Sequence, residues 1–298
     1  MQFFSTRNAN LCTSSAEAVV RGIAPDGGLY LPQTFPAFPM ERLTSMTDAE
    51  VSAAVLCALF DDLPADDIRR AVRAAYGTSF EGGHLSPLRK VGGFFVSELW
   101  HGPTCAFKDV ALCFLPHLLS LSSRTLGITD KICILTATSG DTGSAALSGF
   151  SDVPGTEIIV FYPDGGVSPM QKRQMVTCAG KNTAVCAVRG NFDDAQSGVK
   201  ALFAAGLSVP GVRFSSANSI NIGRLAPQIA YYFMNYRDLL SSGEISVGDR
   251  VDFVVPTGNF GDILAGYFAL RMGLPVGRLI CASNENRVLT DFFRTGVY

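Results

Sequence analysis

The side chain best placed for covalent chemistry in this sequence is a lysine within an apolar segment. Lys108 follows residues 101–107 (His-Gly-Pro-Thr-Cys-Ala-Phe) and precedes Asp109 and an apolar stretch that favours a helix. Such neighbours can desolvate the amine and hold it as a nucleophile able to form a Schiff base. A solvated or ion-paired lysine near a helix start fits the same residues. Two further motifs favour the chemical interpretation.

The first of these motifs is a strand, a tight turn and a helix. Strand-like residues 132–135 lead into Thr136-Ala-Thr-Ser-Gly-Asp-Thr-Gly143, and a small-residue helix pattern follows. Glycines let the backbone approach a ligand, and the N–H groups at a helix N-terminus attract anions. N-capping by Ser139 or Asp141 needs no ligand. Capping explains one such residue, however, whereas five polar or glycine positions together favour a binding turn.

The second motif repeats this order. Residues 251–255 are strand-like, Pro256-Thr-Gly-Asn-Phe-Gly-Asp262 predicts a turn, and residues 263–270 predict a helix. Glycines beside a helix N-terminus can direct several N–H donors at a phosphate. Because loops at the carboxyl ends of parallel strands converge on one crevice, the lysine and both turns can share a ligand. A phosphorylated aldehyde fits all three features.

Together these residues resemble a known family, the pyridoxal-phosphate enzymes of the tryptophan-synthase fold type, and within it the threonine synthases. Cysteine synthase and serine dehydratase share the lysine and the two turns, but are not expected to carry the amino-terminal block or the Ser-Ala-Asn-Ser-Ile-Asn segment. The resemblance spans nearly the whole chain and rests on Ser5-Thr-Arg7, Ala24-Pro-Asp-Gly-Gly-Leu-Tyr-Leu-Pro32, Glu98-Leu-Trp-His-Gly-Pro-Thr104, Lys108-Asp109, Thr138 to Gly143, Gly190-Asn-Phe-Asp193, Ser216-Ala-Asn-Ser-Ile-Asn221 and Thr257 to Asp262.

The resemblance implies an enzyme that uses pyridoxal 5'-phosphate to convert O-phospho-L-homoserine and water to L-threonine and phosphate, by γ-elimination and β-hydration. Lys108 would carry the cofactor, and its freed amine would move protons at Cα and Cβ. The implied cofactor-binding residues are Lys108, Gly258, Asn259, Phe260, Gly261 and Asp262. The implied substrate-binding residues are Thr138, Ser139, Gly140, Asp141, Thr142, Asn218, Ser219 and Arg224.

Arg224 also has an interpretation from its own position. A guanidinium one turn into a helix can bind a phosphate in bidentate fashion, although a salt bridge at the helix start fits the same residue. His101 could orient a group near Lys108, but a packed or capping histidine is favoured. No His or Cys spacing suits a metal, so none is expected.

Two alternatives to a threonine synthase remain. Threonine-synthase-like phospho-lyases share these motifs and release phosphate to leave a 2-keto acid. The chain stops at Tyr298, whereas threonine synthases of this type continue for on the order of a hundred residues or more, including the side chain that faces the pyridine nitrogen. We therefore also consider a catalytically incomplete fragment that binds cofactor weakly or turns over poorly. A nicotinamide dehydrogenase is disfavoured because no Gly-x-Gly-x-x-Gly follows a strand.

Composition fits a soluble metabolic enzyme. The 298 residues are 47% hydrophobic and 17% charged, which is enough to bury a large core. The net charge of −2 provides no basic patch for nucleic acid. Eight cysteines without Cys-x-x-Cys pairs favour reduced thiols in the cytoplasm. We find neither a secretion signal nor an apolar run of ~18 residues, so no membrane span is expected, and the protein is expected to be a monomer or homodimer.

The pattern of elements predicts an α/β fold of pyridoxal-phosphate fold type II, with two parallel-sheet three-layer domains and a helical N-terminal subdomain. We expect the N-terminal subdomain over residues 1–85, a domain with the lysine and the substrate turn over 86–214, and a partial second α/β domain with the cofactor-phosphate loop over 215–298.

Local signals place several elements within these regions. Thr47 and Glu50 form a capping-box pattern that opens a helix over 51–60, and residues 64–67 open another that ends near 76–77. Ser168 is a plausible cap before Pro169. Strand-like runs that would form a parallel sheet lie at 94–96, 132–135, 157–162, 184–188, 251–255 and 279–282.

Overall fold

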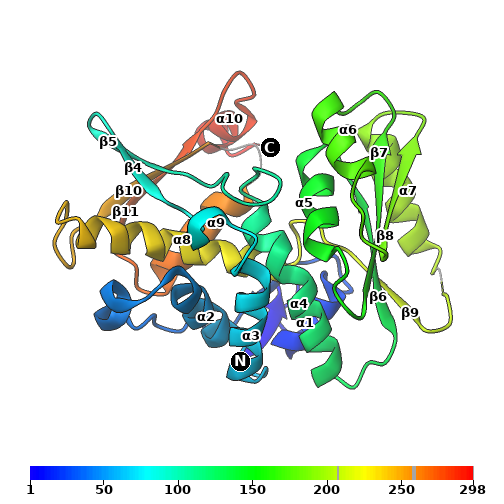
Figure 1. Cartoon of the computed structure of the whole chain (residues 1–298), viewed down its shortest axis with the longest axis horizontal. Helices are drawn as coiled ribbons and strands as arrows, with labels where there is room; N and C mark the ends of the chain where they lie inside the picture. Colours follow the sequence, from blue (N-terminus) through cyan, green and yellow to red (C-terminus); the bar gives the residue numbers. More distant parts are fainter. Residues whose placement is uncertain (207, 257–259, 298) are drawn as a thin grey trace.

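Two parallel sheets form the framework of the protein (Figure 1). The computed structural model describes residues 1–206, 208–256 and 260–297. The larger sheet has the order β8-β7-β6-β9 and contains β6 (Lys131–Ala137), β7 (Thr156–Pro163), β8 (Thr183–Val188) and β9 (Val212–Ser215). The smaller sheet pairs β10 (Val251–Pro256) with β11 (Val276–Ala282).

Helices cover the larger sheet on both sides. On one side α5 (Asp141–Phe150) packs against β7, with α6 (Pro169–Val176) beside it, and on the other side lies α7 (Phe192–Ala204) (Figure 1). The strand-turn-helix predicted at Gly143 is therefore present as β6 followed by α5. This α/β arrangement confirms the predicted fold class.

The amino-terminal region is helical, as predicted, but also contains a small sheet. Thr47 caps α2 (Asp48–Leu59) through a complete capping box, and α3 (Ala65–Tyr76) follows Pro64. Asp26 lies in a turn, where its carboxylate accepts hydrogen bonds from Ser5 Oγ at 2.8 Å and Gly28 N at 2.9 Å. The elements not predicted are an antiparallel sheet of β1 (Gln2–Ser5), β2 (Cys12–Ser14) and β3 (Tyr30–Pro32), together with α1 (Ser15–Arg21) and the 3₁₀ helix η1 (Met40–Ser45).

One predicted member of the parallel sheet lies elsewhere. The run at 94–96 forms β5 (Phe94–Ser97), which pairs antiparallel with β4 (Leu88–Val91) in a separate hairpin. Its register pairs Val91 with Phe94, so Gly92 and Gly93 form a two-residue loop. A Gly-Gly pair with a positive φ at Gly92 (+61°) favours such a tight hairpin. This turn signal outweighs the alternation of strands and helices that predicted a strand of the parallel sheet. The assignment of this strand to the parallel sheet was wrong.

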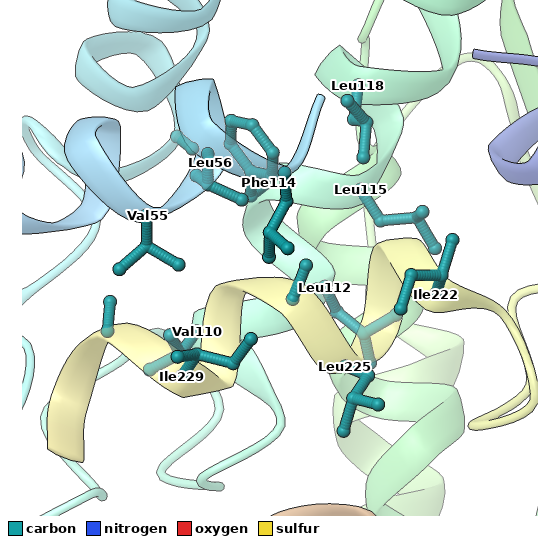
Figure 2. Packing of buried hydrophobic residues seen from close by; sticks show 14 of the residues in the cluster. Val55, Leu56, Val110, Leu112, Phe114, Leu115, Leu118, Ile222, Leu225 and Ile229 are labelled. Carbon is teal, nitrogen blue, oxygen red and sulfur yellow. The ribbon is translucent and has the colours of Figure 1, made fainter. Parts of the chain in front are cut away.

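The core joins helices from distant parts of the sequence. Figure 2 shows buried side chains of α2, α4 (Asp109–Thr125) and α8 (Ile222–Ser241) packed against one another. The two central helices α4 and α8 bury mostly apolar side chains, but α8 also buries the polar or charged residues Arg224, Gln228, Asn235 and Arg237. The remaining helices are η2 (Glu81–Gly83), α9 (Gly261–Arg271) and α10 (Val288–Thr295). Helix α4 packs against α1, α3, α5 and α8, and Lys108 lies at its N-cap.

Candidate active site

Lys108 is presented by a loop that a buried carboxylate holds in shape. Asp109 is fully buried, and its oxygens accept hydrogen bonds from Thr104 N at 2.8 Å, Thr104 Oγ1 at 2.6 Å and Ala106 N at 3.4 Å. A Cβ at Gly102 would lie 2.6 Å from the Asp109 side chain, so only glycine fits there. Burial raises the pKa of Asp109, while its hydrogen bonds act in the opposite direction. The residue after the lysine therefore shapes the loop.

The Lys108 amine points toward the turn before α5. Its Nζ donates to Asp141 Oδ2 at 2.7 Å and lies 5.0 Å from the centroid of the Phe107 ring. The lysine side chain is only 12% exposed, whereas that of Asp141 is 51% exposed. The hydrogen bond from Lys108 lowers the pKa of the Asp141 carboxyl. The structure thus brings the predicted lysine and the predicted substrate turn into contact.

Within that turn, Thr138 has a local task. Its hydroxyl is buried, accepts from Gly140 N at 3.0 Å and Gly143 N at 2.9 Å, and lies 3.2 Å from Gly140 O. Gly140 has a φ of +147°, which residues with a Cβ rarely adopt. Ser139 and Asp141 are exposed and Thr142 is half-buried at the surface of the same turn. Thr138 therefore stabilises the turn, Asp141 is hydrogen-bonded to Lys108, and Ser139 and Thr142 lie at the surface of the turn.

The segment before α8 approaches the same edge of the sheet. Asn218 Oδ1 accepts from Thr136 Oγ1 at 3.1 Å, and Thr136 is next to the end of β6 from which the α5 turn starts. The neighbouring Ser219 is exposed. Asn221 caps α8 by accepting from Gly223 N at 2.8 Å. These contacts place Asn218 beside the strand that carries the substrate turn.

Arg224 is an unusual buried cation. Its side chain is in the interior, with the residue 3% exposed, and its Nη1 donates to Ala217 O at 2.5 Å. Its Nε has no hydrogen-bond partner among the residues that the structure describes. Burial lowers the pKa of Arg224 to about 10. A salt bridge for Arg224, the alternative interpretation from the sequence, is not among the ion pairs of the described residues.

The third predicted loop is only partly described. Thr257, Gly258 and Asn259 lie outside the described residues, so their predicted contacts with cofactor phosphate are not addressed. Phe260 is exposed just before α9, and Gly261 begins the helix.

The side chain of the next residue, Asp262, is directed at α8. Its Oδ1 accepts from the hydroxyls of Tyr231 at 2.5 Å and Tyr232 at 2.9 Å. Burial raises the pKa of Asp262, and the two tyrosine hydrogen bonds oppose this rise. The carboxylate therefore fixes α9 on α8, and its role toward a cofactor stays a prediction.

Sequence reasoning missed Gln171. The predicted cap at Ser168 is confirmed as a complete capping box with Gln171, but the glutamine also donates from Nε2 to Asp141 Oδ1 at 2.8 Å. His101 contacts Glu98 at 2.8 Å and Glu81 at 3.5 Å, which agrees with a packed histidine. The cap was readable from Ser-x-x-Gln, but the contact with a residue 30 positions away was not.

The described residues contain neither a membrane-spanning helix nor a candidate metal cluster. Across residues 1–206, 208–256 and 260–297, no helix is long and apolar enough to cross a membrane. The same part of the chain contains no cluster of three or more His, Cys, Asp or Glu side chains that could hold a metal ion.

Comparison with protein families matches most of the chain. Residues 2–76 match the family model for the threonine synthase N terminus, and residues 83–298 match that for pyridoxal-phosphate dependent enzymes. The crystal structure of threonine synthase from Escherichia coli is 33% identical, with a TM-score of 0.83, over 100% of this chain and 67% of that chain. The chain belongs to the threonine synthase family of pyridoxal-phosphate-dependent enzymes.

Other members of the threonine synthase family are also similar. The crystal structure of pyridoxal-phosphate-bound threonine synthase from Brucella melitensis is 40% identical, with a TM-score of 0.89, over 99% of this chain and 63% of that one. A protein named threonine synthase-like 1 from Macaca fascicularis is 42% identical over 95% of this chain and 40% of its own length. This chain therefore spans between two fifths and two thirds of the relatives compared.

Proposed function

We propose that this chain forms the lysine-bearing and substrate-binding part of a threonine synthase, which converts O-phospho-L-homoserine and water to L-threonine and phosphate. The observation that carries the proposal is the contact of the shielded Lys108 amine with Asp141, at the turn where β6 leads into α5. The matches to the pyridoxal-phosphate dependent enzymes and to the threonine synthase N terminus support the proposal.

The residues present fit pyridoxal phosphate. Lys108 offers a largely shielded amine to an aldehyde, and the positive end of the α9 dipole, at the N-terminus of that helix, favours a phosphate. We infer that these two places hold the cofactor, with Phe260 and Asp262 alongside. When bound, the pyridine ring withdraws electrons from the substrate and makes the proton on its Cα removable.

The chain's own groups have separate tasks in this reaction. The Lys108 amine is the base that would move protons at Cα and Cβ of the substrate. Ser139 and Thr142, at the N-terminus of α5, would bind the substrate's carboxylate, because this helix end favours negative charge. Within the described part of the chain the Nε of Arg224 has no hydrogen-bond partner, and this residue is close in sequence to Asn218, which supports a role in binding the substrate's phosphate.

The compartment and assembly follow from less specific features. We place the protein in the cytoplasm, and its eight cysteines, all free in the structure, support a reducing compartment. We expect a monomer or homodimer whose partner is the small-molecule substrate.

The second candidate is a phospho-lyase that releases phosphate and leaves a 2-keto acid. The similarity to threonine synthase-like 1, at 42% identity, is the observation that favours it. Both candidates use the same lysine and the same phosphate leaving group, so only the carbon product separates them.

The test compares wild-type protein with Lys108→Arg, which keeps the positive charge beside Asp141 but removes the amine. Each protein is incubated with pyridoxal phosphate, freed of excess cofactor, reduced with borohydride and mapped by peptide mass spectrometry. We expect label at Lys108 in the wild type only, and a fall in phosphate release from O-phospho-L-homoserine of about 10³-fold or more in the variant.

The products then decide between the candidates. L-Threonine in step with phosphate supports the synthase, whereas a 2-keto acid in its place selects the phospho-lyase. Wild-type protein without label at Lys108 would contradict both.

A further inference from the structure

Gln171 connects the cap of α6 to the carboxylate that contacts Lys108. Its Nε2 donates to Asp141 Oδ1 at 2.8 Å, while its Oε1 accepts from Ser168 N at 3.2 Å and Ser168 Oγ at 3.0 Å. The other Asp141 oxygen, Oδ2, accepts from Lys108 Nζ at 2.7 Å. Each oxygen of the carboxylate therefore has its own donor, one from α6 and one from the lysine.

The glutamine amide is packed into place over the turn. A Cβ at Gly140 would lie 2.5 Å from both Nε2 and Oε1 of Gln171, so this amide covers a position that only glycine can occupy. One turn further along α6, Met175 is fully buried, and Gln174 Nε2 lies 3.5 Å from Thr104 O in the lysine loop. Helix α6 thus contacts both segments that meet at the lysine.

Without the glutamine, the Asp141 carboxylate would lose one of its two side-chain partners. The Asp141 side chain is 51% exposed, so solvent offers it alternative orientations away from the lysine. A hydrogen bond from a neutral amide holds a carboxylate in one orientation without competing for its charge. The amide of Gln171 is well placed to keep Oδ2 directed at the amine.

We propose that Gln171 is a positioning residue that holds the Asp141 carboxylate against Lys108 and thereby sets how readily the lysine amine reacts with an aldehyde. The proposal rests on the proposed function of Lys108 as the cofactor lysine. The proposal adds Gln171 of α6 to the site, as a residue that touches neither the lysine nor the reacting atoms and acts through Asp141.

Other charges surround this contact within the described part of the chain. On α4, the buried Asp109 follows the lysine directly, and its charge interacts with that of Lys108. On α6, Lys172 and Arg173 are exposed next to Gln171, and Lys172 pairs with Asp164 at 3.2 Å. None of these groups forms a hydrogen bond or ion pair with the Asp141 carboxylate within the described part of the chain, so a change at Gln171 acts on Lys108 mainly through Asp141.

The experiment measures how the capture of Lys108 by pyridoxal depends on pH. Pyridoxal lacks the phosphate, and the adduct is fixed with borohydride and quantified at Lys108 by peptide mass spectrometry. Lys200 is exposed and, among the described residues, donates to the neutral Gln196, so it reports the reagent's own pH dependence. Capture requires the neutral amine, so a weaker ion pair moves the midpoint to lower pH.

Two variants at position 171 separate positioning from helix capping. Gln171→Ala removes the donor to Asp141, and we expect the Lys108 midpoint to fall by roughly half a pH unit. Gln171→Glu still accepts from Ser168 and keeps the α6 cap, but it replaces the donor with a second negative charge. We expect its midpoint to rise, because the added carboxylate favours the charged lysine.

The Asp141→Asn background shows whether the glutamine acts through Asp141. In that background Gln171→Ala should cause no further shift, since the ion pair is already absent. An unchanged midpoint in Gln171→Ala, an equal shift in the Asp141→Asn background, or no capture of wild-type Lys108 would each overturn the proposal. This experiment measures capture of Lys108 and not turnover of a substrate. A protein that forms no threonine would contradict the proposed function, but it would leave the capture midpoints unchanged.

Discussion

Two aspartates near the candidate lysine have opposite environments and, we infer, different tasks. Asp109 is fully buried, and burial raises its pKa, whereas the hydrogen bond from Lys108 lowers the pKa of the more exposed Asp141. Among the residues that the structure describes, the hydrogen bonds to Asp109 come from its own loop, while Asp141 joins the lysine to α6. Substitutions at the two positions should therefore affect different properties.

The change Asp109→Ala should lower the free energy of unfolding by about 2–3 kcal/mol, because it leaves the N–H groups of Thr104 and Ala106 without their acceptor in a buried loop. Asp141→Asn is the matched control, and its unfolding free energy should stay within about 0.5 kcal/mol of the wild type. Urea denaturation followed by circular dichroism measures both. Equal losses in the two variants would show that the loop does not depend on Asp109.

His101 should give the lysine loop a stability that depends on pH. Its hydrogen bond with Glu98 at 2.8 Å is the main cause that raises its pKa, and a second contact with Glu81 adds to it. A pKa raised by folding stabilises the native state fully below the unfolded pKa of ~6.5, and this contribution is lost as pH rises through the folded value.

The corresponding variant is His101→Gln. The difference in unfolding free energy between wild type and this variant should be larger at pH 6 than at pH 9. Glu98→Gln, which removes the charged acceptor, should abolish most of the same pH dependence. A difference that grows toward pH 9 would contradict the ion pair with Glu98 as its source.

At the scale of elements, the lysine and its turn depend on how closely α4 and α5 approach each other. A Cβ on Gly149 in α5 would overlap the backbone carbonyl of Leu112 in α4. Backbone cannot rotate away as a side chain can, so the helices would have to separate. The N-terminus of α5, which bears Asp141, and that of α4, next to Lys108, would move with them.

Gly149→Ala should therefore destabilise the protein by about 1–3 kcal/mol despite the better helix propensity of alanine. Gly198→Ala in α7 is the matched control, because a Cβ there has no atom within 4 Å, and it should stabilise by about 0.5–1 kcal/mol. Thermal unfolding of both variants checks the signs. If Gly149→Ala is as stable as the wild type, the close approach of the two helices does not fix their spacing.

Sequence patterns predicted the elements whose signals are local. The capping box at Thr47 was found from side chains three residues apart, and the cap at Ser168 from the proline that follows it. Strands β6, β7, β8, β10 and β11 were found from short apolar runs. The short strand β9 was missed because Val212–Ser215 has only four residues and is recognised by its pairing with β6. The hairpin of β5 was misplaced because the Gly-Gly turn was not weighed.

The site was predictable only as a set of residue types. Lys108 and Asp141 were both identified, but their ion pair joins segments 33 positions apart, and the link to Gln171 needs α6 to pack on the α5 turn. The burial of Arg224 depends on the core around α8, which no local pattern reveals. Contacts that arise from tertiary packing could therefore not be predicted from the sequence, whereas the chemistry of the individual side chains could.

At the scale of the whole molecule, the amino-terminal region packs on the rest through a shared core and a buried ion pair. Residues of α2 and α8 belong to one hydrophobic cluster, as Figure 2 shows. Arg237 of α8 donates from Nη2 to Asp48 Oδ1 at 2.7 Å and from Nη1 to Met46 O at 3.0 Å, and the other Asp48 oxygen accepts from Leu85 N at 2.9 Å. The predicted boundary near residue 85 stays a prediction, but this ion pair crosses it.

The last prediction tests whether that connection couples the amino-terminal region to the lysine loop. Arg237→Met leaves Asp48 buried without its cation and should lower the unfolding free energy by about 3 kcal/mol. Arg278→Met, which breaks an ion pair of a side chain that is 76% exposed, should cost less than about 1 kcal/mol. The single tryptophan, Trp100, lies beside the lysine loop, so its fluorescence and the far-UV circular dichroism report different parts of the molecule. We expect both signals to shift together in Arg237→Met, because one continuous core unfolds cooperatively. If the fluorescence transition stayed in place while the dichroism shifted, the region that contains Asp48 would unfold independently of the candidate site.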